Sequence, residues 1–398
     1  MMTLTDAGGI KMIFGMDKEK MKDLGAVYTV SEIRQQPMLW EETYNIVKEN
    51  EEKIKSFLSR SLNENTRIVL TGAGTSDYVG DTIYTYLAKK LNLRVEAIAS
   101  TDLVSNPEEF IEEDVPTILV SYARSGNSPE SVGAFNLFKD NVKDISQLVI
   151  TCNSEGELAK KASISDRDLC VLMPENSNDK SFAMTSSFSC MLLASLLIFD
   201  IKNLEENKKY VDIVINQGNS ILDTKWADIK ELTELKSERV VYLGSGALKG
   251  LCQEMALKNL ELTSGKVVSV CESVLGFRHG PKSIINDETL VIFMNSNNKY
   301  TNLYDMDLIK EINSDSGNHK LAVISYEKNE ELKDVCDKYI EIDGQTIPEV
   351  YTVFNYMLFG QIFGLFNSIR LGISPDNPRP DGTVNRVVKG VVIHKYNK

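Results

Sequence analysis

The sequence has few of the residues that usually hold metals or form disulfides. Its only histidines lie far apart, and no two of its cysteines have the C-x-x-C spacing. The histidines are His279, His319 and His394, and the cysteines are Cys152, Cys170, Cys190, Cys252, Cys271 and Cys336. We therefore predict no metal site, and we expect reduced thiols in the core rather than disulfides.

The sequence also lacks an excess of basic residues and any long apolar run. A net charge of -13 argues against nucleic acid or an anionic membrane as a partner, because both are bound by clusters of cations. The longest apolar run, residues 190–199, is too short to span a bilayer and predicts a buried helix. Residues 1–6 lack the basic and apolar regions of a secretory signal, so we expect a cytoplasmic protein without a membrane partner.

Two copies of one pattern follow each other along the 398 residues. An apolar strand with a glycine turn at 67–74 recurs at 239–246, and the next apolar strands, 118–120 and 290–292, keep the same offset. Continuous apolar runs alternating with helical segments predict parallel sheets with both faces covered. We expect a helical arm, two domains and a proline-rich tail, with the boundaries 1–50, 51–215, 216–370 and 371–398.

A hydroxyl-rich segment at 121–131 follows one of these apolar strands. Ser125 and Ser128 can donate hydrogen bonds, Gly126 allows close backbone approach, and Pro129 fits the first turn of a helix. Hydroxyls and free N–H groups at a helix N-terminus suit a phosphate. Taken alone, the segment equally fits an ordinary loop with a serine N-cap.

Two further segments, 70–77 and 178–187, have similar composition after other apolar strands. They contribute Gly74, Thr75, Ser76, Lys180 and Ser181. In a parallel sheet all three would emerge at the carboxyl edge, where they could close on one small anion. The corresponding stretch of the second copy, 296–300, lacks the serine–glycine element, which predicts one phosphate site per chain.

A dinucleotide site is disfavoured, although both glycine turns begin as G-x-G. The third glycine position of the fingerprint holds Asp77 in the first copy and Lys249 in the second. The acidic side chain of Asp77 would repel a pyrophosphate.

Candidate acid/base groups lie in the second copy. Glu254, Lys258 and Glu261 are spaced to share one helix face, which is also the pattern of a solvated, salt-bridged surface. His279 follows in a glycine–proline turn, where a histidine can also be incidental.

Together, these motifs resemble the tandem sugar-isomerase (SIS) family over about residues 30–398. The nearest branches are the isomerase half of glucosamine-6-phosphate synthase and the galactosamine-6-phosphate deaminase/isomerases, also described as tagatose-6-phosphate ketose/aldose isomerases. The resemblance implies two three-layer α/β/α domains, each with a mostly parallel sheet and helices on both faces. It also implies a homodimer or higher oligomer with shared active sites.

The resemblance also implies roles for individual residues. Glu261 would move a proton between C1 and C2 of the sugar, and Lys258 and Glu254 would tune it. His279, from a neighbouring subunit, would open the sugar ring, and Lys389 would contact the reacting carbonyl. The phosphate would be held by Gly74, Thr75, Ser76, Ser125, Gly126 and Ser128. Further substrate contacts are expected from Arg124, Asn127, Lys180 and Ser181, of which Arg124 and Asn127 stand where the synthase loop has glutamine and glutamate.

The implied reaction is conversion of galactosamine 6-phosphate to tagatose 6-phosphate and ammonia, without metal or organic cofactor. The chain has no cysteine before Cys152, whereas the synthase uses an N-terminal cysteine to release ammonia from glutamine. Two alternatives stay open: an aldose–ketose isomerase acting on a neutral hexose 6-phosphate, and a non-catalytic sugar-phosphate sensor.

Overall fold

Two parallel five-stranded sheets form the framework of the protein. The computed structural model describes residues 12–388 and 390–396. The first sheet has the order β2-β1-β3-β4-β5 and the second the order β10-β9-β8-β6-β7. The first is built from β1 (Arg67–Thr71), β2 (Arg94–Ala97), β3 (Thr117–Ala123), β4 (Ile145–Thr151) and β5 (Leu169–Leu172). The second is built from β6 (Arg239–Leu243), β7 (Val268–Glu272), β8 (Thr289–Met294), β9 (Lys320–Ser325) and β10 (Lys338–Glu341).

The two sheets have the same topology, which confirms the predicted repeat. Read from the edge at β7, the second order becomes 7-6-8-9-10 and matches 2-1-3-4-5 strand for strand. The order places a topological switch point between β1 and β3, where doubly wound sheets bind ligands. The tandem α/β/α architecture is therefore confirmed. The division at 1–50, 51–215, 216–370 and 371–398 remains a prediction. We call the sheet β1–β5 with its helices the first domain, and β6–β10 with its helices the second.

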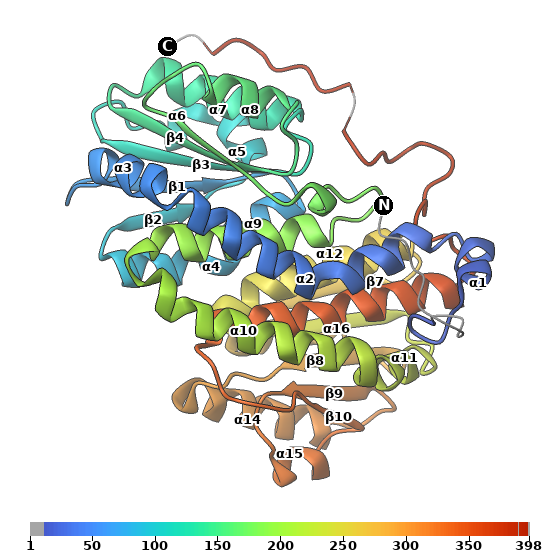
Figure 1. The fold of residues 1–398 in the computed structure, drawn as a ribbon. Helices are drawn as coiled ribbons and strands as arrows, with labels where there is room; N and C mark the ends of the chain where they lie inside the picture. The colour runs from blue at the N-terminus through green and yellow to red at the C-terminus, as the bar shows by residue number, and fades with distance from the viewer. Residues whose placement is uncertain (1–11, 389, 397–398) are drawn as a thin grey trace.

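Helices cover both faces of each sheet. The longer ones are α2 (Val27–Glu49), α3 (Glu51–Ser61), α4 (Thr75–Leu91), α7 (Pro129–Asn141), α9 (Ser186–Phe199), α10 (Leu204–Ser220), α11 (Trp226–Thr233), α12 (Ala247–Leu262), α14 (Lys299–Ser314) and α16 (Glu349–Arg370). The shorter ones are α1 (Lys18–Asp23), α5 (Ser100–Ser105), α6 (Pro107–Phe110), α8 (Glu157–Ala162), α13 (Val274–Phe277) and α15 (Glu330–Asp334). In Figure 1, α7 and α8 lie beyond the first sheet and α14 and α15 beyond the second, α3 lies beside the first sheet, and α4, α9, α12 and α16 lie between the sheets.

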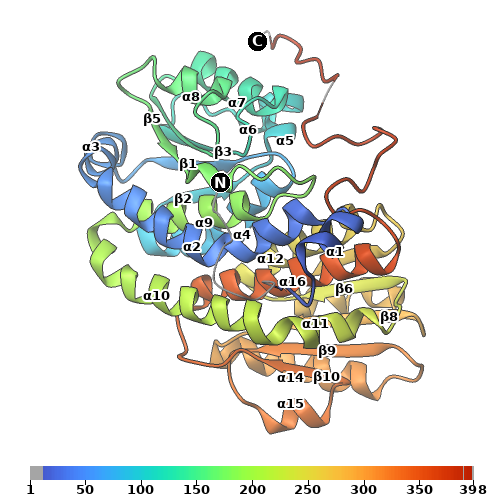
Figure 2. The ribbon, with the colours of Figure 1, turned by 45° about the vertical axis from the view of Figure 1, so that its right-hand side comes forward.

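The two domains share one hydrophobic core between the sheets. Alternate residues of corresponding strands, such as Ile68 of β1 and Val240 of β6, point into this single cluster. Their neighbours Val69 and Val241 point into the separate outer clusters. Helix α9 runs through the shared core with every residue buried, which confirms that the apolar run 190–199 is a buried helix. Figure 2 shows this helical layer between the sheets from a second direction.

The helices that follow the two glycine turns, α4 and α12, pack closely against each other. Gly250 of α12 lies so near the backbone of Asp81 of α4 that a Cβ on Gly250 would come within 2.5 Å of it. Only glycine allows this approach, because real Cβ atoms do not come so near to backbone. The contact brings the C-terminal half of α12 toward the N-terminus of α4.

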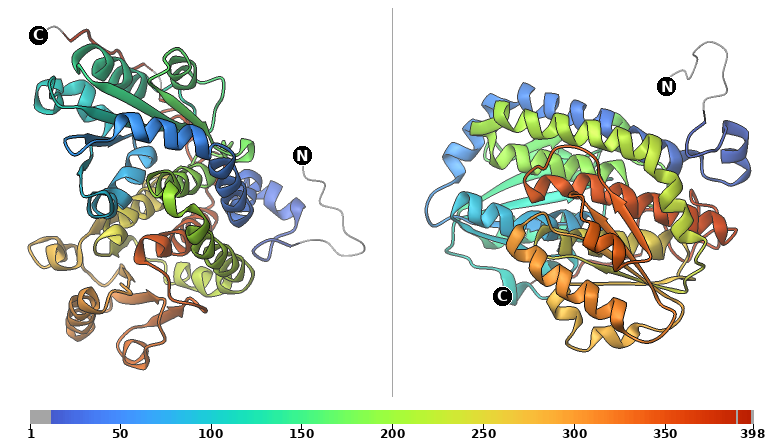
Figure 3. Two further views of the ribbon diagram at one scale, coloured as in Figure 1. Left: turned by 60° about the vertical axis from the view of Figure 1, so that its left-hand side comes forward. Right: turned by 90° about the horizontal axis from the view of Figure 1, so that it is seen from below.

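The N-terminal helices and the C-terminal tail both pack across the domains. Figure 3 shows α2 beside α10 in its right-hand view, and α2 also packs against α9. After α16, the described residues of the proline-rich tail, 371–388 and 390–396, contain no helix, and the tail runs past the first domain toward α7 (Figures 1 and 2). Among the described helices, none is by itself both long and apolar enough to cross a membrane, and only the strongly bent pair 186–199 and 201–233 meets those criteria jointly.

Candidate active site

The predicted phosphate turn lies at the switch point of the first sheet. Gly74 ends the turn after β1 with φ 58° and ψ −126°, a conformation that favours glycine. Thr75 and Ser76 begin α4, and no side chain caps this helix. The N–H groups of Ser76 and Asp77 donate to the carbonyls of Ala73 and Gly74 in the turn. The N-terminal end of α4 keeps its partial positive charge, and the hydroxyls of Thr75 and Ser76 stand beside it.

The loop between β3 and α7 lies beside this turn, because β3 pairs with β1. Gly126 has φ 67°, and Ser125 is half-buried. Ser128 precedes Pro129 at the start of α7 and donates to Ser131 Oγ over 2.7 Å, while no side chain caps the helix. Asn127 is exposed, and its Oδ1 accepts from the N–H of Glu157 over 2.9 Å. The loop thus offers two serine hydroxyls and a second uncapped helix.

Arg124 joins this loop to two distant segments. Its guanidinium donates from Nη1 to the carbonyl of Phe182 (3.3 Å) and from Nη2 to the carbonyl of Arg386 in the tail (2.6 Å). Burial lowers the pKa of Arg124, and the neighbouring positive charge of Arg386 adds to this effect. Glu261 is among the carboxylates that oppose the shift, so its charge lies within electrostatic reach of Arg124.

The loop that carries Lys180 and Ser181 is held by a glutamate of the N-terminal arm. Glu32, on α2, accepts the N–H of Lys180 over 2.6 Å and also the N–H and hydroxyl of Ser181. Burial raises the pKa of Glu32 to about 7, and the charge of nearby Asp179 adds to the shift. Lys180 is exposed, whereas Ser181 is fully buried by these contacts.

The predicted acid/base residues meet the phosphate turn directly. Lys258, on α12, donates to Thr75 Oγ1 over 2.8 Å and forms an ion pair with Glu261 over 2.5 Å. The second carboxylate, Glu254, lies 3.5 Å from the same ammonium group. One buried lysine of the second domain therefore connects the phosphate turn of the first domain to both predicted carboxylates.

Burial differs sharply among these three side chains. Lys258 and Glu254 are fully buried, whereas the side chain of Glu261 keeps 25% of its surface exposed. Burial raises the pKa of Glu254 to about 8, against the opposing effect of Lys258. Burial alone would lower the pKa of Lys258, but the two carboxylates outweigh it and raise the value. Glu261 is thus the carboxylate of the set that a substrate can reach. The solvated, salt-bridged surface considered from sequence does not describe this helix face.

We call the turn 70–77 and the loop 121–131, at the carboxyl ends of β1 and β3, the phosphate corner of the first domain. Several buried polar atoms around this corner have no hydrogen-bond partner among the described residues. They include the hydroxyls of Thr71 and Ser121, which pair in register at the ends of β1 and β3, and Nε of Arg124. Unpartnered buried polar groups are rare and mark places where a ligand or water supplies the missing bond. Thr71 and Ser121 lie in the predicted segments 70–77 and 121–131 but were not named there as site residues, and Glu32 was missed because a single acid in a helix carries no local signal.

Two predicted residues are not brought to this corner by any described contact. His279 is exposed, and its ring has no hydrogen-bond partner among the described residues. Lys389 lies outside the described residues, although Arg386, three positions earlier, contacts the loop 178–181. Nε of Arg386 donates to the carbonyl of Asp179 over 2.9 Å, and Nη2 donates to Asn178 Oδ1 over 3.2 Å. The roles assigned to His279 and Lys389 remain predictions.

The site combines anion donors with acid/base groups. In the described part of the chain, no group of three histidine, cysteine, aspartate or glutamate residues could hold a metal ion. A buried ammonium beside a reachable carboxylate, next to uncapped helix N-termini, is suited to moving protons on a phosphorylated substrate.

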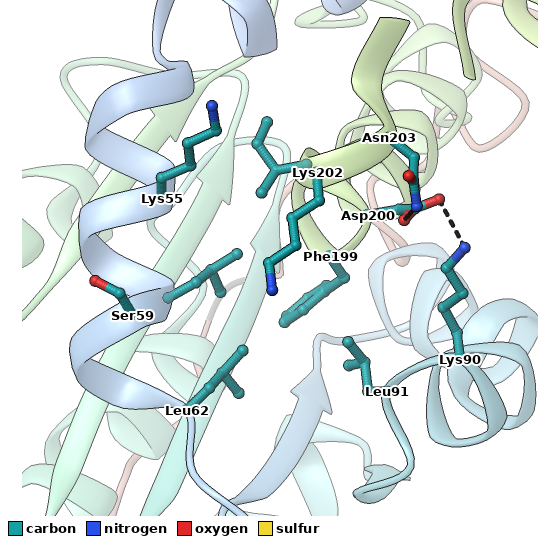
Figure 4. Close-up of a pocket in the computed structure, with 11 residues that line it drawn as sticks. Lys55, Ser59, Leu62, Lys90, Leu91, Phe199, Asp200, Lys202 and Asn203 are labelled. Carbon is teal, nitrogen blue, oxygen red and sulfur yellow. Dashed lines mark hydrogen bonds and ion pairs between the residues drawn. The ribbon is translucent and has the colours of Figure 1, made fainter. Parts of the chain in front are cut away.

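A cavity of about 690 Å³ lies elsewhere, where α3, α4 and the end of α9 meet. Figure 4 shows its lining, with Lys90 paired to Asp200 over 3.0 Å and Lys202 extending across it. The C-terminal end of α4 lines this cavity with Lys90 and Leu91, and the 17 residues of α4 from Thr75 to Leu91 place it about 24 Å along the helix from the phosphate turn. Its lysines and apolar side chains include no acid/base set like that around Lys258.

Comparison with known proteins identifies the family. The model of the SIS domain matches residues 61–200 and 235–361. The chain belongs to the SIS domain family. Over 390 residues, this SIS protein is 43% identical to D-galactosamine-6-phosphate deaminase AgaS of Shewanella sp. (strain ANA-3), with 96% of each chain covered.

Two solved SIS structures are also closely similar. One, from Clostridium novyi NT, is named as a candidate tagatose-6-phosphate ketose/aldose isomerase. It has a TM-score of 0.95 and 46% identity, covering 98% of this chain and 100% of that one. The tagatose-6-phosphate ketose/aldose isomerase of Escherichia coli has a TM-score of 0.85 and 35% identity, covering 93% and 97%. The family resemblance inferred from the motifs is confirmed.

Proposed function

We propose that this protein is a deaminase/isomerase that converts galactosamine 6-phosphate to tagatose 6-phosphate and ammonia. The observation that carries the proposal is Lys258, which contacts Thr75 in the phosphate turn and Glu261 on the acid/base helix at the same time. The similar proteins named as a galactosamine-6-phosphate deaminase and a tagatose-6-phosphate ketose/aldose isomerase support the same substrate and product.

The phosphate binds between the N-termini of α4 and α7 in the first domain. Thr75 and Ser76 contribute from α4, and Ser125 and Ser128 contribute from the loop before α7. The glycines Gly74 and Gly126 let the backbone approach, and the helix N-termini favour the dianion. Further contacts come from Arg124, Asn127 and Lys180. Ser181, expected from sequence to contact the substrate, instead holds this loop in place, because it is buried and its N–H and hydroxyl bind Glu32.

The reaction proceeds by proton transfer between adjacent carbons. Glu261 removes the proton from C2 of the open-chain aldose while O1 gains a proton, which gives an enolamine. It then returns a proton to C1 while the amino group loses one, which gives a ketimine. Water then hydrolyses the ketimine to the ketose phosphate and ammonia. General acid/base transfer of this kind contributes about 10²–10⁴ in rate per group. Lys258 forms an ion pair with Glu261, and burial raises the pKa of Glu254 and so favours its neutral form, which does not compete for the ammonium group.

The remaining groups come from the tail and from a second chain. Lys389 contacts the carbonyl end of the sugar, and His279 of a neighbouring subunit opens the ring, so the active protein is at least a dimer. We place the enzyme in the cytoplasm. This location is supported by its six free cysteines, since disulfides are rare in reducing compartments.

The experiment is incubation of the protein with galactosamine 6-phosphate and, separately, glucosamine 6-phosphate, with and without EDTA. We expect ammonia and tagatose 6-phosphate in equal amounts from the galacto substrate, unchanged by EDTA. Glu261→Gln serves as the control that binds substrate without turnover. Ketose formed without ammonia from a neutral hexose 6-phosphate would instead indicate a simple isomerase, and binding with no product would indicate a sensor.

A further inference from the structure

The second domain contains a corner that matches the phosphate corner of the first. Gly246 ends the turn after β6 with φ 59° and ψ −128°, within two degrees of the values of Gly74. The loop after β8, residues 295–298, stands where the first domain has the loop after β3. Its backbone could therefore receive an anion in the same way.

In the second domain a carboxylate of the chain itself occupies this corner. Ser296 Oγ donates to Glu349 Oε2 and accepts the N–H of Asn298 over 3.1 Å. The backbone N–H groups of Asn297 and Asn298 also oppose the rise that burial gives to the pKa of Glu349. A Cβ on Gly246 would lie 3.6 Å from Glu349 Oε1, whereas a Cβ on Gly74 would have no atom within 4 Å. The corner is thus open in the first domain and filled in the second.

The difference originates at the N-termini of two equivalent helices. Glu349 is the first residue of α16, which follows β10, and the equivalent first residue of α9, which follows β5, is Ser186. The second domain also caps α14 with the side chain of Asn298, whereas no side chain caps α7. Glu349 and the Asn298 side chain accept hydrogen bonds in the second domain, and among the described residues the equivalent side chains of the first domain accept none from the loop after β3 or from backbone N–H groups at the start of α7.

We propose that Glu349 is a built-in anion that closes a latent oxyanion site in the second domain. The site takes a small tetrahedral oxyanion, such as inorganic phosphate, when the carboxylate is removed. A tethered carboxylate competes at a high effective concentration, which keeps free phosphate out of the intact protein. The donors left for phosphate are Ser296 Oγ and the N–H of Asn297, because Asp305 accepts the N–H of Ser296 over 2.8 Å and Ser296 Oγ accepts the N–H of Asn298 over 3.1 Å. The comparison with the first domain rests on the proposed function, which places the substrate phosphate in the first domain's corner.

The experiment counts phosphate ions bound per chain by calorimetric titration with inorganic phosphate. We expect one for the wild-type protein, two for Glu349→Ser, and one again for Glu349→Ser combined with Ser296→Ala. A crystal of Glu349→Ser grown with phosphate should show the second ion between Ser296 and Gly246. The matched control is Glu330→Ser, which removes an exposed acid at the first residue of α15 and should leave the count at one.

A folded Glu349→Ser protein that binds no more phosphate than wild type overturns the proposal, as does a wild-type protein that already binds phosphate in the second domain. If Glu349→Ser fails to fold, Glu349→Gln preserves the size of the side chain and should admit the second phosphate with lower affinity, and its failure to do so is equally decisive. Wild-type protein binding none and Glu349→Ser binding one would support the latent site while contradicting the proposed phosphate site of the first domain.

Discussion

Arg124 Nη2 donates to the backbone carbonyl of Arg386 over 2.6 Å, and this bond ties the loop after β3 to the C-terminal tail. The two residues are 262 positions apart in the chain. A second bond from Arg124, to Phe182, ties in the loop before α9. One buried guanidinium therefore holds together three of the segments that surround the proposed phosphate site.

Replacing Arg124 with lysine should loosen the tail as well as lower activity. Lysine lacks the planar fork that reaches both carbonyls, and a hydrogen bond from a charged group is worth about 1.5–3 kcal/mol, so kcat/KM should fall roughly 10- to 150-fold. Limited proteolysis should then cut faster beyond residue 371. Arg167→Lys, in an exposed pair with Asp144, is the control. Reduced activity with unchanged tail cleavage would mean that Arg124 acts on the substrate alone.

Ser125→Ala and Glu261→Gln should have separable kinetic effects. The serine is proposed to hold phosphate, so its loss should raise KM and cost about 10- to 150-fold in kcat/KM. The glutamate is proposed to carry the proton, so its amide should lower kcat with little change in binding. Steady-state kinetics on galactosamine 6-phosphate measure both. Near-normal turnover by Glu261→Gln would remove that residue from the proton transfer.

The raised pKa of Glu254 predicts a specific dependence of stability on pH. The unfolded chain releases this proton near the ordinary value of 4.5, whereas the folded protein retains it until about 8. The folded state therefore binds more protons between these values, and the stability contributed by the neutral carboxyl is lost as pH rises through this window. Relative to wild type, Glu254→Gln should gain up to about 1.4 kcal/mol of stability per pH unit there.

Thermal unfolding of the wild type and Glu254→Gln at a series of pH values measures this difference. The slope, rather than the absolute stability, is the readout, because the amide also leaves Lys258 with one carboxylate fewer. The exposed Glu238→Gln serves as a control for the loss of one acidic side chain. Parallel curves for wild type and Glu254→Gln would mean that Glu254 is ionised in the folded protein.

The sequence predicted the sheets well where strands are buried and poorly at one edge of each sheet. The apolar strands predicted within 67–74, 118–120, 239–246 and 290–292 were confirmed as β1, β3, β6 and β8, because a strand covered on both faces consists of apolar residues. Strands β2 and β7 were missed. Both lie at an edge and are only partly buried, so the sequences of Arg94–Ala97 and Val268–Glu272 show no continuous apolar run.

The site was predictable where its residues form local motifs. The glycine turn at Gly74 and the helix with Lys258 carry recognisable spacing, and the structure brings them together. Contacts such as Glu32 with Ser181 and Glu349 with Ser296 join residues that are 149 and 53 positions apart. Nothing near Glu349 in the sequence distinguishes it from an ordinary acid in the first turn of a helix, so its place in the second corner required the fold.

Mixing two inactive variants should restore activity if His279 serves the neighbouring subunit. Each site of the proposed dimer would combine Glu261 of one chain with His279 of the other. The exposed position of His279, without a partner for its ring among the described residues, is compatible with such an arrangement. A mixed dimer of Glu261→Gln and His279→Ala chains would then carry both lesions in one site and none in the other.

With random pairing of equal amounts, half of the dimers are mixed and half of their sites are intact, so about a quarter of wild-type activity should return. The measurement is ammonia release after subunit exchange, with exchange verified by native mass spectrometry. As a control, each variant is taken alone through the same exchange procedure and should stay inactive. Verified exchange without recovery would mean that His279 acts within its own chain or has no part in the reaction.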